Sequence, residues 1–228
     1  MGKIGYGYGS EWHLLRYLGR HREELNRGII KAAGAGTRVE WLDFDYTGIR
    51  KQPDAELKGL DFLAGPKYRK VRSKWREFWP PGGKPNWDAV GWLYRSGGKD
   101  LLLVEAKAHV NELESTCQAK SEASRRQINR ALDDTKEYLG AREKAVWTEK
   151  FFQYANRLAT LYFLNVHGVP SRLILVYFVG DVFPGGTRGP KKAATWREAL
   201  RKQDRYLGIP RSHPLKGLIH KLFLPVTR

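Results

Sequence analysis

The chain has 228 residues, 41% of them hydrophobic and 12% aromatic, which is enough to bury a globular core and excludes a wholly disordered protein. Its 41 lysines and arginines against 24 acidic residues give a formal net charge of +17, which predicts a polyanionic partner such as nucleic acid. The single cysteine excludes a disulfide framework, and no apolar run approaches the roughly 18 residues of a membrane span, so we expect a cytoplasmic protein without membrane contact.

The first predicted element is a helix from Ser10, as its N-terminal cap, to about Ile30. Glu11 shares one stripe of this helix with Leu14 and Leu18, so we expect its carboxylate to point with the apolar face. The alternative for Glu11 is a simple complement to the helix dipole, because it lies in the first helical turn.

A strand is predicted over 39–44, and a basic, aromatic insertion follows at about 47–85. The centre of this insertion interleaves cations with aromatic rings. Cations neutralise phosphates and flat rings stack on bases, so the segment predicts a nucleic-acid-binding surface. The residues expected to bind are Lys67, Arg69, Lys70, Arg72, Lys74, Trp75 and Arg76. The alternative is a surface helix that packs its rings inward and leaves its basic face solvated.

A β-hairpin is predicted next, with strands over 89–94 and 101–107 joined by a glycine turn. Because side chains alternate along a strand, Glu105 and Lys107 share one face. Asp88 opens the first strand, and antiparallel pairing brings that start beside the end of the second strand. Two such carboxylates repel each other unless a hard cation lies between them. The hairpin therefore predicts a divalent-metal site, with a solvated Glu105–Lys107 pair on an ordinary amphipathic hairpin as the alternative.

The remaining elements predict one α/β domain over residues 1–228, a mixed sheet flanked by helices. They are a polar helix over about 115–139, an apolar helix over 149–167, a buried strand over 171–181, a helix from 194 or 195 to about 207 and an edge strand over 219–226. Gln153, Asn156 and Arg157 interrupt the apolar helix. Buried polar groups need partners, so we expect these three to form a structural network, with a phosphate contact as the alternative.

Asp88 on one strand and Glu105-Ala106-Lys107 on the next resemble the PD-(D/E)XK nuclease superfamily, which has the restriction-endonuclease-like fold. The proline of the family pattern is absent here. The resemblance implies that Asp88, Glu105 and the Ala106 carbonyl bind the metal and that Lys107 orients the attacking water. It also adds Glu11 to the metal site, because a glutamate on the first helix often joins the site in this superfamily.

The expected activity is Mg²⁺- or Mn²⁺-dependent hydrolysis of DNA phosphodiester bonds, with Asp88, Glu105, Lys107 and Glu11 as the catalytic residues. RNA is the alternative substrate, and both a monomer and a homodimer fit the sequence. The alternative from another functional class is a non-catalytic nucleic-acid-binding protein that retains the nuclease fold.

Overall fold

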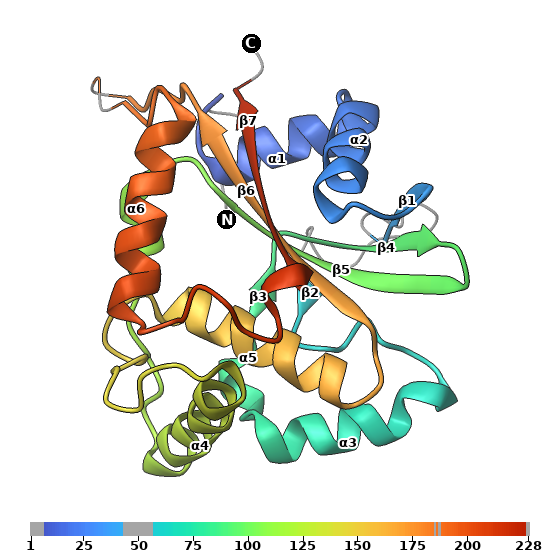
Figure 1. Ribbon diagram of the computed structural model, residues 1–228, viewed down its shortest axis with the longest axis vertical. Helices are drawn as coiled ribbons and strands as arrows, with labels where there is room; N and C mark the ends of the chain where they lie inside the picture. The colour runs from blue at the N-terminus through green and yellow to red at the C-terminus, as the bar shows by residue number, and fades with distance from the viewer. Residues whose placement is uncertain (1–6, 43–56, 185, 187, 227–228) are drawn as a thin grey trace, which may run out of the picture.

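The computed structural model describes residues 7–42, 57–184, 186 and 188–226, and it shows a mixed sheet between two layers of helices (Figure 1). The five strands lie in the order β1 (Arg38–Trp41), β4 (Ala89–Arg95), β5 (Gly98–Lys107), β6 (Ser171–Val179) and β7 (Ile219–Pro225). The first three pair antiparallel, whereas β5, β6 and β7 are parallel. A small second sheet pairs β2 (Leu57–Lys58) with β3 (Asn86–Trp87). The predicted mixed sheet flanked by helices is confirmed.

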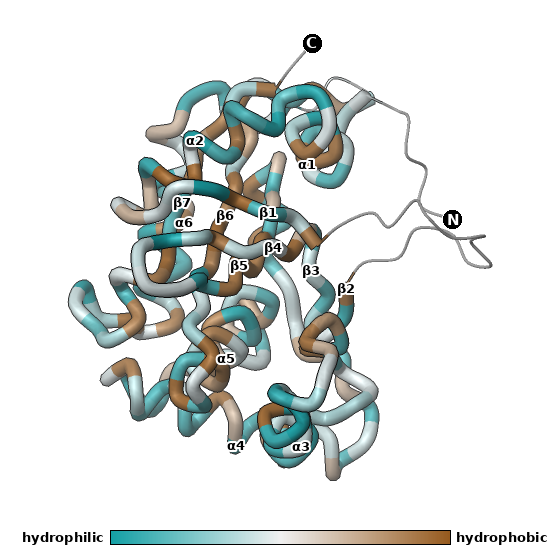
Figure 2. The backbone as a smooth tube through the Cα atoms, turned by 90° about the vertical axis from the view of Figure 1, so that its right-hand side faces the viewer, coloured by the Kyte–Doolittle hydropathy of each residue, from teal (hydrophilic) through white to brown (hydrophobic). Residues whose placement is uncertain are grey.

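Figure 2 views the sheet between its helix layers, with α1 and α2 on one side and α3, α4 and α5 on the other. The first layer comprises α1 (Ser10–Gly19) and α2 (Arg22–Ala33). The second comprises α3 (Arg69–Phe78), α4 (Glu122–Leu139), α5 (Phe152–Val166) and α6 (Ala193–Tyr206). Short 3-10 turns lie at 66–68, 81–83, 110–113 and 216–218. None of the helices in the described ranges is long and apolar enough to cross a membrane.

Strand β5 runs through the middle of the sheet and divides the core in two. Leu101 and Leu103 belong to the hydrophobic cluster of the four-helix layer, whereas Leu102 and Val104 belong to the cluster under α1 and α2. All four are fully buried, as expected of a strand covered on both faces. Glu105 continues the row of Leu101 and Leu103, so it enters the interior on the side of the four-helix layer.

The predicted single helix from Ser10 to Ile30 is wrong, because the chain turns at Arg20 and His21 between α1 and α2. The amides of both turn residues donate to the Arg16 carbonyl, which ends α1. Ser10 is not the cap either: Gly9 holds that position, and the Ser10 hydroxyl donates to Glu112 at 2.7 Å. Of the predicted strand over 39–44, residues 39–41 lie in β1 and residue 42 follows the strand, while residues 43–44 and residues 47–56 of the insertion lie outside the described residues.

Candidate functional site

The start of β4 and the end of β5 bring the two sequence-predicted carboxylates together. The β4–β5 register pairs Ala89 with Val104, and Asp88 immediately precedes this pair. The Asp88 amide donates to the Val104 carbonyl at 3.2 Å, and Asp88 Oδ2 accepts a hydrogen bond from the Ala106 amide at 2.7 Å. The Asp88 carboxylate thus accepts the Ala106 amide in place of a backbone carbonyl of the strand beside β5.

Glu105 is buried, with 4% of its surface exposed, and both of its oxygens face cations. Oε2 lies 2.8 Å from Arg157 Nε and 2.6 Å from Arg157 Nη2, while Oε1 accepts a hydrogen bond from the Lys107 amine. Two cations for one buried carboxylate offset the desolvation of its charge. The structure therefore places Glu105 and Lys107 side by side, as the strand alternation predicts.

Arg157 is the residue of this site whose role the sequence left open, and it is itself buried. Besides Glu105, it contacts the Asn156 side chain at 2.6 Å and the Asn86 carbonyl. Its guanidinium lies over the Trp87 ring, 4.6 Å from the ring centre. These contacts tie α5 to β3 and β5, so Arg157 has the structural bracing role that its position in an apolar helix predicts.

The two carboxyl groups differ in their electrostatics. Burial and the neighbouring Glu105 carboxylate raise the pKa of Asp88 to about 7, although Lys107, the Ala106 amide and Arg157 act in the opposite direction. Burial also acts to raise the pKa of Glu105, but Arg157 and Lys107 outweigh it and hold that pKa below its ordinary value. Asp88 forms no ion pair with any described residue. The site therefore contains a charged Glu105 beside a carboxyl group that lacks a cation of its own.

The donor set at this point fits a hard divalent cation. In a strand the amide and carbonyl of one residue point to the same side, so the Ala106 carbonyl faces the side on which its amide meets Asp88. Mg²⁺ prefers oxygen ligands and commonly uses one or two carboxylates and several waters. The described part of the chain contains no cluster of three or more His, Cys, Asp or Glu side chains that could hold a metal. An ion here would therefore rely on Asp88, Glu105, a backbone carbonyl and water.

A small cavity of about 20 Å³ adjoins the Glu105 and Lys107 side chains. Its other walls include Gln153 from α5 and Gln203 from α6. A space of this size accommodates one water molecule, although most of its lining surface is apolar. The site thus has room for a single small ligand atom beside the lysine.

Within the described residues, Glu11 forms no hydrogen bond or ion pair with Asp88, Glu105 or Lys107. Its side chain is exposed, whereas Leu14, Tyr17 and Leu18 of the same helix are buried against the sheet. That helix covers the face of the sheet opposite to Glu105. The expectation that Glu11 points with the apolar face is wrong, because packing of Tyr17 and Leu18 rotates the helix and turns Glu11 to solvent.

The basic helix α3 has two unlike faces. The exposed cations are Arg69, Lys70, Lys74 and Arg76 of α3 and Lys67 of the preceding 3-10 turn. Trp75 is only 4% exposed, stacks on Trp79 and packs edge-on against Phe163 of α5. The prediction that Trp75 stacks on bases is therefore wrong, because its ring belongs to the core. Arg72 donates to the carbonyls of Leu63 and Gly65, so it also serves the fold.

No family model, curated protein or solved structure matches this chain. Function is therefore inferred from the residues of the chain itself.

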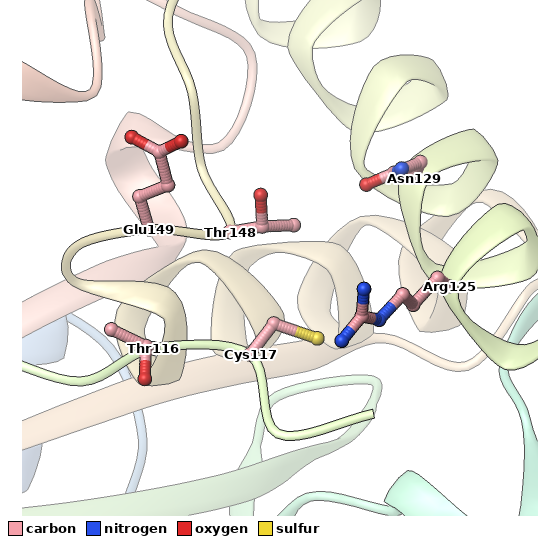
Figure 3. A pocket seen from close by; sticks show the side chains of 6 residues that line it. All are labelled: Thr116, Cys117, Arg125, Asn129, Thr148 and Glu149. Atoms are coloured by element: carbon pink, nitrogen blue, oxygen red, sulfur yellow. The ribbon is translucent and has the colours of Figure 1, made fainter. Parts of the chain in front are cut away.

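An open pocket of about 430 Å³ lies beside α4 (Figure 3). It is lined by Thr116, Cys117, Arg125, Asn129, Thr148 and Glu149. The Cys117 thiol and the Arg125 guanidinium point toward each other across it (Figure 3), while Arg125 Nε donates to the Ala119 carbonyl at 2.8 Å. No residue of the candidate site lines this pocket, so the two features are separate.

Proposed function

We propose that this protein is a metal-dependent nuclease with a restriction-endonuclease-like fold, which hydrolyses phosphodiester bonds of DNA. The observation that carries the proposal is the meeting of Asp88, Ala106, Glu105 and Lys107 at one end of the β4–β5 hairpin. The raised pKa of Asp88 supports it, because a carboxyl group that resists ionisation beside a second carboxylate is what a bound cation would stabilise.

In this proposal Asp88, Glu105 and the Ala106 carbonyl hold Mg²⁺ or Mn²⁺. The bound ion supplies a water of lowered pKa and neutralises charge on the phosphate. Lys107 donates a hydrogen bond to the attacking water or to a phosphate oxygen, from a position already fixed against Glu105. Arg157 keeps Glu105 ionised and in place. The exposed cations of α3 and the net charge of +17 attract the phosphate backbone.

The test is cleavage of linear, nicked, branched and single-stranded DNA, and of RNA, by the purified protein with Mg²⁺ or Mn²⁺. We expect the wild-type protein to cleave DNA and Lys107→Ala to bind it without cleavage. Lys99→Ala is the matched control, because Lys99 lies on the same strand and its amine lies over the rings of Trp92 and Tyr94, away from Glu105. Binding without cleavage of any substrate by the wild-type protein would refute the proposal.

A second candidate function is a nucleic-acid-binding protein without turnover. The favouring observation is that Arg157 and Lys107 already neutralise both oxygens of Glu105, so this carboxylate is electrostatically satisfied without a metal. This candidate predicts salt-sensitive binding that neither Mn²⁺ nor Lys107→Ala changes.

A further inference from the structure

A second, strongly basic pocket lies between α6, the segment that follows it and the edge strand β7. Its volume is about 670 Å³. Its cationic and titratable walls are Arg201, Arg205, Arg211, His213, Lys216 and Lys221. In Figure 1 the segment that joins α6 to β7 passes across α5. Three separate stretches of chain thus contribute positive charge to one hollow.

Most of these cations have no acidic partner. Within the described ranges, Arg201, Arg205, Arg211 and Lys216 form no ion pair, whereas Lys221 Nζ lies 3.4 Å from Asp204 Oδ2. The charge of Arg201 also acts on the nearby Glu198 carboxylate. The charges of Lys216 and Lys221 also act on His213, where together with burial they lower its pKa despite the opposing effect of Asp204. Cations gathered around one space repel each other, and a bound anion removes that repulsion.

The pocket lining also includes Asp204 and His213, whose hydrogen-bonding capacity is not fully used. Asp204 Oδ1 and His213 Nδ1 have no hydrogen-bond partner among the described residues. A deprotonated phosphate oxygen repels a carboxylate oxygen, whereas a hydroxyl or amino group can donate to it. A ligand that carries a hydrogen-bond donor as well as negative charge therefore complements this lining better than an anion alone. A volume of about 670 Å³ is in the range of small-molecule sites and far exceeds one phosphate.

We propose that this pocket binds a nucleotide, with its phosphate on the cations and a sugar hydroxyl on Asp204. The nucleotide is either free or the terminal unit of a nucleic-acid strand, since both present the same phosphate and hydroxyl groups. Tyr154 lines both this pocket and the cavity beside Glu105, but none of the pocket cations contacts Glu105. The proposal therefore stands whether or not the protein cleaves DNA.

The experiment is calorimetric titration in EDTA, so that metal-dependent cleavage cannot contribute. The probes are AMP, ADP, inorganic phosphate, and a DNA trinucleotide with and without a 5′-phosphate. We expect the nucleotides to bind more tightly than inorganic phosphate. Tighter binding of AMP than of the phosphorylated trinucleotide assigns the pocket to free nucleotides, and the reverse order assigns it to strand ends.

Two variants separate the parts of the ligand. Arg211→Ala/Lys216→Ala should weaken nucleotide binding at least about tenfold, as expected for lost charge-assisted hydrogen bonds. Asp204→Asn should weaken binding of AMP and strengthen binding of inorganic phosphate, because it removes a hydroxyl acceptor and a negative charge together. The control, Arg20→Ala/Lys31→Ala, removes the same charge from exposed positions in the α1–α2 layer and should leave both affinities within about twofold.

Three results would overturn the proposal. The first is no binding of any nucleotide in the millimolar range. The second is equal weakening by the pocket variant and the control, which indicates general attraction to a basic protein. The third is an equal effect of Asp204→Asn on AMP and inorganic phosphate, which leaves the carboxylate without a role in recognition.

Discussion

Replacing Arg157 with methionine tests whether the interior of the site depends on a fixed cation. Methionine retains much of the aliphatic stem but removes the guanidinium. Glu105 would remain buried with Lys107 as its only cation, and the contacts with Asn156, Asn86 and Trp87 would also be lost. The change therefore removes the second positive charge at Oε2 together with these three contacts.

Removing one partner of a buried ion pair destabilises a protein by about 3–5 kcal/mol, because the other charge stays desolvated. Lys107 still neutralises part of the charge on Glu105, so we expect the lower end of this range, about 3 kcal/mol. In a chain of this size, 1 kcal/mol corresponds to roughly 2–4 °C in Tm. The Arg157→Met protein should then unfold about 6–12 °C below the wild type.

The assay is urea unfolding in EDTA at pH 7, with Arg157→Met/Glu105→Gln as the matched control. The double variant has no uncompensated charge, so it should recover part of the stability that the single variant loses. A single variant as stable as the wild type would refute the bracing role of Arg157. A double variant no more stable than the single one would show that the charge of Glu105 is not what Arg157 stabilises.

Three further outcomes are expected. Burial and Glu105 raise the pKa of Asp88 to about 7, so protonation of Asp88 stabilises the folded state relative to the unfolded state. This contribution to the free energy of unfolding is complete below about pH 4 and is lost as the pH rises through 7. Urea titrations in EDTA should show less of this loss in Asp88→Asn, and parallel pH profiles would contradict it. Lys70→Ala/Lys74→Ala should lower by about 2 the slope of the logarithm of DNA affinity against the logarithm of salt concentration, without shifting Tm. Trp75→Ala should lower the free energy of unfolding by about 3–5 kcal/mol and leave the DNA affinity of the folded protein unchanged. Mn²⁺ at about a hundred times its Kd should add about 2.7 kcal/mol to the wild type, and an equal gain in Asp88→Asn would place the ion elsewhere.

The parts of the site that could be predicted from the sequence are those set by local pattern. Alternation along β5 puts Glu105 beside Lys107, and a short glycine turn fixes the antiparallel partner, so that Asp88 meets the end of the strand. Both relations depend on residues close in sequence. They need no knowledge of how the helices pack.

The parts that could not be predicted depend on packing between distant segments. Glu11 and Leu14 are both compatible with an inward stripe, and only the fit of Tyr17 and Leu18 against the sheet decides which of them faces solvent. Arg157 is 52 positions from Glu105, and no local signal names its partner. The inward rotation of Trp75 has the same origin, because Phe163 of α5 provides the surface that it packs on.

The hydrogen bond from the Ala106 amide to the Asp88 carboxylate continues the β4–β5 hydrogen bonding with a side chain in place of a backbone carbonyl. A glutamate at position 88 has the same charge, but its extra methylene would carry the carboxylate past the amide and leave the strand end unpaired. The length of the side chain at position 88 should thus matter more for the stability of this strand end than its charge. Asparagine at position 88 should keep the hydrogen bond to the Ala106 amide, and with it the sheet, while it removes the charge that a bound metal needs. Replacing one carboxylate oxygen therefore distinguishes the structural role of Asp88 from its proposed role in metal binding.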